Sequence, residues 1–117
     1  GDRRVLDAFC HDGLFGLLAL AGGAEELVFL DQSAPALERL QQNLVRNGWA
    51  ERSGIQRRAV NAFHELRALR DAGERFDAIA LDPPAFAKSR KEVPAARRCY
   101  REINAQALRL LRPGGML

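Results

Sequence analysis

The 117-residue sequence is poor in cysteine and has no long apolar run. Its two cysteines, Cys10 and Cys99, cannot form the disulfide framework of a small secreted domain, so a reducing, cytoplasmic compartment is expected. No apolar stretch approaches the roughly 18 residues that a membrane-spanning helix needs. Residues 1–4 lead directly into the first apolar pair, without the hydrophobic region of a signal peptide. These absences argue against secreted scaffolds and membrane proteins.

Other patterns are missing as well. The sequence has no internal repeat, and its 47% hydrophobic and 28% charged residues match an ordinary globular domain. No His, Cys and Asp residues have the spacing of metal ligands, so we expect no metal, and His11 and His64 are expected to be surface residues. The segment from Asp7 to Gly16 lacks the first glycine of G-x-G-x-x-G, which argues against a dinucleotide-binding dehydrogenase.

Positive charge is concentrated in one part of the chain. The formal net charge is +3, but residues 88–112 alone contain eight bases and two acids, a net +6, which leaves −3 for the remainder. A concentrated basic segment favours a polyanionic partner such as nucleic acid over a uniformly basic surface. The alternative interpretation is a solvated helix face without a partner.

Short apolar runs alternate with amphipathic stretches. We expect strands at residues 5–9, 27–30, 55–60 and 76–81, and helices at 14–21, from Ser33 to Asn47, at 62–72 and at about 95–111. The third strand is polar and is therefore expected at a sheet edge. The glycines and proline at 113–115 are expected to close the last helix, and residues 116–117 to begin a fifth strand.

This order of elements predicts an α/β fold. Strands separated by helices pair in parallel through right-handed crossovers, which gives a doubly wound, Rossmann-like sheet with helices on both faces. We expect residues 1–117 to form one partial domain, truncated at the start of strand five.

Three of the predicted strands end in polar residues, where a parallel sheet binds its ligand. Gly13 allows a tight turn after the first strand. Asp31 can accept both hydroxyls of a ribose, or alternatively cap the next helix. The segment Asp82-Pro-Pro-Ala-Phe86 joins a rigid backbone to an acceptor and a flat apolar ring, which suits a planar base better than it suits a plain turn.

These segments resemble class I S-adenosylmethionine-dependent methyltransferases. Residues 5–10 with Gly13 and Phe15 resemble the first motif of that class, and residues 30–37 followed by Asn43 and Asn47-Gly48 resemble the second. The closest resemblance is to the large-subunit ribosomal RNA cytosine-5 methyltransferases that carry an N-terminal PUA domain. It rests on residues 76–89, on Tyr100-Arg-Glu-Ile-Asn104 and on residues 110–115.

The resemblance implies S-adenosyl-L-methionine as cofactor and assigns a set of residues to it. The methionine end would lie against Asp7, Phe9, Cys10, Gly13 and Phe15. The adenosine would lie against Asp31, which takes the ribose hydroxyls, and against Gln32, Ser33, Asn61, Ala62 and Phe63. An acidic residue is usual where this chain has Asn61, whose side-chain oxygen would accept from the adenine amine. The methyl group and the target base would face Asp82, Pro83, Pro84 and Phe86.

The resemblance also implies the reaction, which is methyl transfer to carbon 5 of a cytosine in RNA after thiolate addition at carbon 6. The nucleophilic cysteine is expected beyond residue 117, and Cys99 is a poorer candidate. Residues 88–98 are expected to form a mobile loop that orders on RNA, with phosphate contacts from Lys88, Arg90, Lys91, Arg97 and Arg98. Two alternatives stay open: transfer to an exocyclic base amine, and a cofactor- or RNA-binding module without catalysis.

Overall fold

The computed structural model describes residues 3–10, 13–81 and 93–116. Strands and helices alternate strictly along these residues. In chain order they are β1 (Arg4–Ala8), α1 (Leu14–Ala21), β2 (Glu26–Asp31), α2 (Ala34–Arg46), β3 (Ile55–Ala59), α3 (Ala62–Asp71), β4 (Phe76–Leu81), α4 (Val93–Leu110) and β5 (Leu111–Met116).

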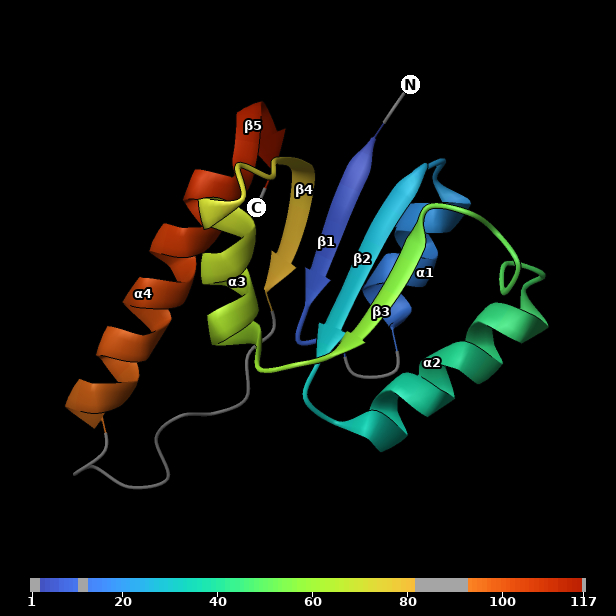
Figure 1. The fold of residues 1–117 in the computed structure, drawn as a ribbon, viewed down its shortest axis with the longest axis horizontal. Coiled ribbons are helices and arrows are strands. Elements are labelled where there is room, and N and C mark those ends of the chain that lie inside the picture. Colours follow the sequence, from blue (N-terminus) through green and yellow to red (C-terminus); the bar gives the residue numbers. More distant parts are fainter. Residues whose placement is uncertain (1–2, 11–12, 82–92, 117) are drawn as a thin grey trace.

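The five strands form one parallel sheet in the order β3-β2-β1-β4-β5. Ala8 lies beside both Leu30 and Leu81, and Asp31 lies beside Ala59, so the carboxyl ends of β1 to β4 meet at one edge. Figure 1 shows the strands pointing together towards this edge. The strand order reverses between β1 and β4, which is where doubly wound folds bind ligands. The predicted fold class is confirmed, as is the edge position of the polar β3.

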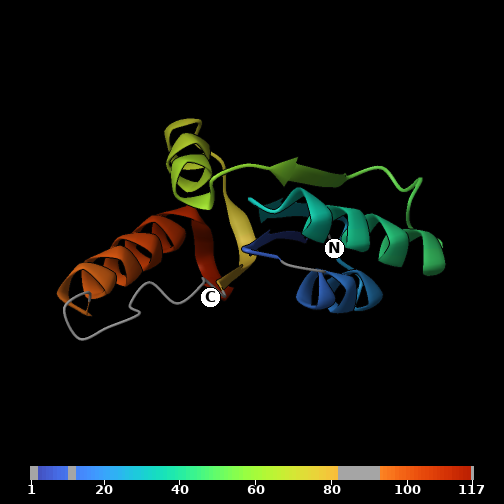
Figure 2. The same cartoon turned by 90° about the horizontal axis from the view of Figure 1, so that it is seen from below.

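Helices cover both faces of the sheet, as Figures 1 and 2 show. Alternate residues of the central strands point to opposite faces. One face packs against α1 and α2, and its buried residues include Val5, Leu20, Leu27, Phe29, Leu40 and Leu44. The other packs against α3 and α4, and its buried residues include Leu6, Val28, Leu30, Leu66, Ile103 and Ala107. The near-continuous apolar sequences of β1 and β2 follow from this two-sided burial.

The start of α2 follows the predicted capping pattern. The Ser33 hydroxyl accepts a hydrogen bond from the Ala36 backbone N–H at 3.2 Å, and Asn47 is the C-cap of α2. The residues predicted on one face, Leu37, Leu40 and Leu44, are buried. Capping satisfies one of the unpaired N–H groups of the first turn. This anchors α2 directly after the carboxyl end of β2.

The boundary between α4 and β5 differs from the prediction. The helix ends at Leu110 and β5 already begins at Leu111, whereas the sequence predicts a strand only from residue 116. Phe76 pairs with Leu111 and Ala78 pairs with Met116, so the intervening residues of β5 form an irregularity against β4. Gly114, at φ 81°, lies within it. An edge strand tolerates proline and glycine at such a bulge, because its outer side needs no ladder partner.

Candidate cofactor site

The loop after β1 is held by backbone hydrogen bonds. The Cys10 N–H donates to the Leu30 carbonyl at 2.8 Å, which joins the loop to β2. The Gly13 N–H donates to the Cys10 carbonyl, also at 2.8 Å, and closes a tight turn. Gly13 has φ 85° and directly precedes α1, so the predicted need for glycine at this position is met.

Asp7 is buried beneath this loop, with 3% of its surface exposed. Its carboxylate accepts a hydrogen bond from the Gly16 backbone N–H in the first turn of α1 at 3.1 Å. A carboxylate at a helix N-terminus is stabilised by the free N–H groups and by the helix dipole. Asp7 therefore connects β1 to α1 through this hydrogen bond. The sequence pattern indicates Asp7 as a site residue but does not reveal Gly16 as its partner.

Phe9 occupies the left-handed region of backbone space at φ 59°, an unusual conformation for a bulky side chain. Its ring meets the Phe63 ring edge-on, with centroids 6.0 Å apart and planes at 80°. This geometry is favourable for aromatic pairs and adds to the burial of both rings. Two residues predicted separately for the cofactor site, at the end of β1 and the start of α3, are thus in contact.

Asp31 ends β2 and is 8% exposed. One carboxylate oxygen accepts from the Ser33 N–H at 2.8 Å, and the Asp31 backbone carbonyl accepts from the Val60 N–H at 3.0 Å. The second bond holds the ends of β2 and β3 together, and the first fixes the Asp31 side chain; both bonds define this corner. They place a carboxylate at the ligand-binding edge, where it can accept hydroxyl hydrogen bonds. Gln32 and Ser33 follow it and are exposed.

Asn61 precedes α3 and caps it. Its Oδ1 accepts a hydrogen bond from the His64 backbone N–H at 3.3 Å, while its main-chain carbonyl accepts from the Glu65 N–H at 3.0 Å. Ala62 is buried and Phe63 is half-buried. The three residues therefore follow β3 closely, beside the end of β2.

Other predicted site residues lie elsewhere or outside the described residues. Phe15 is 46% exposed on α1 and lines a cavity of about 430 Å³ together with Val5, Ala78 and Gly115, and neither Asp31 nor Asn61 is among its lining residues. The residues expected at the target base and in the first part of the basic segment lie outside the described part of the chain. They are Asp82, Pro83, Pro84, Phe86, Lys88, Arg90 and Lys91.

The C-terminal part of the basic segment is helical, which corrects the prediction of a loop over residues 88–98. α4 begins at Val93, so Arg97 and Arg98 lie on its second turn, and both are exposed. Hydrophobic residues four and seven apart bury one face of α4 and leave these arginines on the other. Arg101, one turn further on, is also exposed. Cys99 is half-buried in the same helix, whereas Cys10 is buried.

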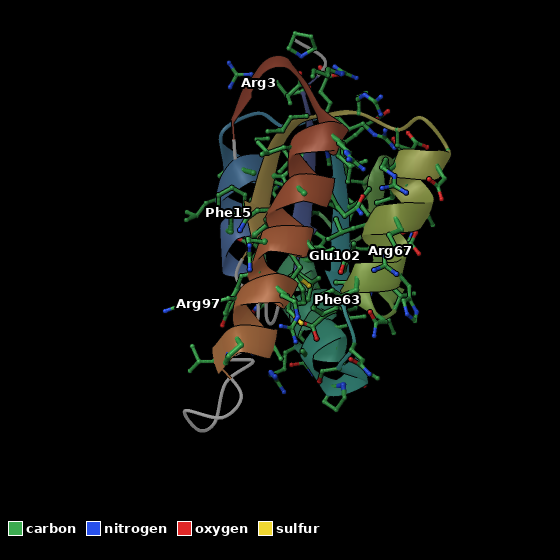
Figure 3. The ribbon with its side chains drawn as sticks, turned by 90° about the vertical axis from the view of Figure 1, so that its left-hand side faces the viewer. Arg3, Phe15, Phe63, Arg67, Arg97 and Glu102 are labelled. Atoms are coloured by element: carbon green, nitrogen blue, oxygen red, sulfur yellow. The ribbon has the colours of Figure 1, made fainter. Side chains whose placement is uncertain are left out.

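Figure 3 shows that Glu102 of α4 lies on the side of α3, whereas Arg97 lies on another side of α4. Arg67 of α3 forms an ion pair with Glu102 of α4, and Arg70 donates to the Gln106 amide oxygen at 2.7 Å. Arg97 points away from α3 in this view. Within the described ranges 3–10, 13–81 and 93–116, Arg97 and Arg98 form no ion pair. The α4 arginines near the ligand edge are thus not neutralised by Glu102, the acid that joins α4 to α3.

Two negative findings concern the residues that the structure describes. No helix among them is long and apolar enough to cross a membrane. No group of three His, Cys, Asp or Glu side chains among them could hold a metal ion.

The sheet order and the two helical layers define the Rossmann-like fold of methyltransferases. A SAM-dependent methyltransferase from Agrobacterium tumefaciens has a TM-score of 0.80 with this chain at 23% identity, over 98% of this chain and 36% of that one. The protein SMU.776, solved as a complex with SAH, has a TM-score of 0.82 at 22% identity, over 97% and 30% of the two chains. At these identities the likeness shows the fold alone.

The chain belongs to the family described as Conserved hypothetical protein 95, whose model matches residues 1–112. It is similar to Ribosomal RNA large subunit methyltransferase I of Aeromonas hydrophila, with 45% identity over 115 residues. The protein of the same name from Photobacterium profundum is 44% identical over 117 residues. Each match covers 98% of this chain and 29% of the relative, so the chain spans less than a third of the length of these curated relatives.

Proposed function

We propose that this chain is the cofactor-binding part of an S-adenosyl-L-methionine-dependent methyltransferase that modifies large-subunit ribosomal RNA. The observation that carries the proposal is the position of Asp31, a buried carboxylate at the ligand edge of a methyltransferase-type sheet. The relatives named as ribosomal RNA large subunit methyltransferases support the substrate class.

The residues at the ligand edge fit this cofactor chemically. Asp31 offers a carboxylate to the ribose diol, and Asn61 offers an amide to the base. The Phe9 and Phe63 rings provide an apolar contact beside them. When bound, S-adenosyl-L-methionine supplies an electrophilic methyl group. The loop fixed by Cys10 and Gly13 closes the site next to Asp7, on the side where the resemblance places the methionine end.

We propose carbon 5 of a cytosine as the methyl acceptor, in an enzyme of the type that also has a PUA domain. This carbon becomes nucleophilic when a cysteine thiolate adds to carbon 6. Its electron pair would take the methyl group, with S-adenosylhomocysteine as the leaving group. A base would then remove the carbon 5 proton, and the electrons of that bond would expel the thiolate from carbon 6. Cys10 is poorly suited to this role because it is buried. The thiolate is therefore expected from a residue other than Cys10.

Methyl transfer tests this function directly. The full-length protein that contains this chain, incubated with radiolabelled S-adenosyl-L-methionine, is expected to label unmodified large-subunit ribosomal RNA. Mass spectrometry of the nucleosides is expected to find 5-methylcytidine. Label on an exocyclic amine would instead support the amine-methylating alternative. Cofactor and RNA binding without any label on RNA would support a non-catalytic module.

The exposed arginines of α4 support an RNA-binding surface beside this site. The N-terminus of α4 lies towards the edge at which the strands end, as Figure 1 shows. Arg97 and Arg98 are exposed there, and guanidinium groups bind phosphate oxygens through charge-assisted hydrogen bonds. We therefore propose that these arginines contact the RNA backbone next to the target nucleotide.

Changing Arg97 and Arg98 together to Gln is expected to lower RNA affinity and its salt dependence. Loss of two phosphate contacts should reduce the slope of log K against log salt by about 1.4 for single-stranded RNA. Fluorescence anisotropy over a salt series measures this slope. Affinity for S-adenosylhomocysteine is expected to stay unchanged.

A matched variant separates this surface from net charge. Arg39 and Arg46 are exposed on α2, which covers the opposite face of the sheet. Their double change to Gln removes the same charge and is expected to leave the salt slope nearly unchanged. Equal slopes in the two double variants would show that α4 does not bind the RNA backbone.

A further inference from the structure

The cap of α3 gives the Asn61 side chain a fixed hydrogen-bonding polarity. Its Oδ1 accepts from the His64 N–H, which would otherwise be one of the unpaired donors of the first turn. The opposite amide orientation would bring N–H groups face to face, so the cap itself identifies the oxygen. The family resemblance implies that this oxygen accepts from the adenine amine, whereas in the structure it accepts from the first turn of α3.

The other polar atom of the amide remains available. Nδ2 carries two N–H donors, and no hydrogen bond from it is formed to any of the described residues. Asn61 is exposed and follows β3 by two residues, where Ala59 lies beside Asp31 in the sheet. The group that Asn61 can offer to a ligand next to Asp31 is therefore a hydrogen-bond donor.

We propose that Asn61 recognises the cofactor base as a donor, through Nδ2 to the N1 ring nitrogen of adenine, and not as an acceptor of the 6-amino group. The proposal rests on the proposed placement of adenine beside residues 61–63. The edge of adenine presents the amino donor next to the N1 acceptor, so donor and acceptor side chains select different atoms. Affinity should then depend on N1 and depend little on the 6-amino group.

An aspartate at this position would behave differently. One carboxylate oxygen could cap α3 while the second accepts from the 6-amino group. Asn61→Asp therefore keeps the helix cap and reverses the polarity of the base contact. Asn61→Ser also keeps a capping oxygen but removes the amide, which makes it the matched control for folding.

Isothermal titration calorimetry with three ligands tests the proposal. They are S-adenosylhomocysteine, a deaminated analogue that carries hydrogen in place of the 6-amino group and keeps N1 as an acceptor, and a 1-deaza analogue that carries C–H in place of N1. The unchanged protein is expected to bind the deaminated analogue within about threefold of S-adenosylhomocysteine, and the 1-deaza analogue about tenfold more weakly. In Asn61→Asp the deaminated analogue is expected to bind about tenfold more weakly than S-adenosylhomocysteine. Asn61→Ser is expected to bind both analogues about as tightly as S-adenosylhomocysteine.

The contrary outcomes are distinct. If Asn61→Asp leaves the ratio of affinities for the deaminated and normal ligands unchanged, Asn61 does not set the polarity of base recognition and the proposal is overturned. Identical affinities of all three proteins for every ligand would place the base away from Asn61. Absence of S-adenosylhomocysteine binding by the unchanged, folded protein would instead refute the proposed cofactor. Thermal unfolding of the three proteins should coincide, because each keeps a cap on α3.

Discussion

Changing Asp31 to Ala is expected to weaken the binding of S-adenosylhomocysteine about 100-fold. The carboxylate is almost completely buried at the end of β2, where a ribose diol would donate two hydrogen bonds to it. Hydrogen bonds to a charged acceptor contribute about 1.5–3 kcal/mol each to stability, and they are shorter and stronger than neutral ones. A loss of about 2.7 kcal/mol corresponds to a factor of about 100 in the dissociation constant. Isothermal titration calorimetry measures it.

Ser33→Ala is the control for Asp31→Ala. Asp31 also accepts the Ser33 N–H, so its removal could loosen the start of α2 as well as the ligand contact. Ser33→Ala removes the cap of α2, at a cost of about 1 kcal/mol of stability, and leaves the carboxylate in place. Its affinity should fall far less than that of Asp31→Ala, because Ser33 contributes only a neutral hydroxyl beside the proposed adenosine position. An equal loss in both variants would assign the effect to the loop, and unchanged affinity in Asp31→Ala would remove Asp31 from the ribose site.

The architecture could be predicted because local and tertiary signals agree. Leucines at spacings of three and four, such as Leu37, Leu40 and Leu44, identify one face of α2, and that face is buried. Ser33 marks the start of the same helix through a hydrogen bond that depends only on neighbouring residues. The polar β3 lies at the edge because a central strand would bury Gln56 without partners.

The prediction was wrong where tertiary pairing overrides a local signal. Residues 113–115 have the composition of a helix stop, and a strand was expected only after them. In the structure Leu111 already pairs with Phe76 in β4, so the proline and glycines lie inside an irregular edge strand. The loop expected over residues 88–98 was wrong over residues 93–98, which belong to α4. The two predictions overlapped at residues 95–98, and the helix predicted from about residue 95 is the one that forms, because Ala96 is buried on the packed face of α4.

The details of the site depend on contacts between distant residues, which a single sequence does not show. Phe9 and Phe63 were each expected near the cofactor, but their edge-on contact and the left-handed backbone of Phe9 have no sequence signal. The two possible roles of Asn61, helix cap and ligand contact, share one side chain. Which of its atoms serves each role becomes visible only when the hydrogen bond to His64 is seen.

Gly16→Ala is expected to destabilise the protein by about 1–2 kcal/mol, although Ala favours a helix. A Cβ at this position would lie 2.1 Å from Cε1 and 2.6 Å from Cζ of Phe29, and 2.9 Å from Cδ2 of Leu27. Phe29 and Leu27 are completely buried. Neither the Phe29 ring nor the Leu27 side chain can therefore move without displacing the sheet or α1. Overpacking of this kind costs about 1–3 kcal/mol and occasionally more. The gain in helix propensity, about 1 kcal/mol, offsets only part of the cost. Urea denaturation measures the difference.

Gly22→Ala, at the C-cap of the same helix, is the matched control, because the φ of Gly22, −82°, suits alanine and its nearest contacts are ordinary at 3.5 Å. It should change stability by less than about 0.5 kcal/mol. If Gly16→Ala is as stable as Gly22→Ala, α1 can lift from the sheet without cost. Lifting would also lengthen the hydrogen bond from the Gly16 N–H to Asp7, beneath the loop that Cys10 joins to β2. The close packing of Gly16 on Phe29 therefore supports the cofactor loop as well as the core, and affinity for S-adenosylhomocysteine should fall together with stability in Gly16→Ala but not in Gly22→Ala.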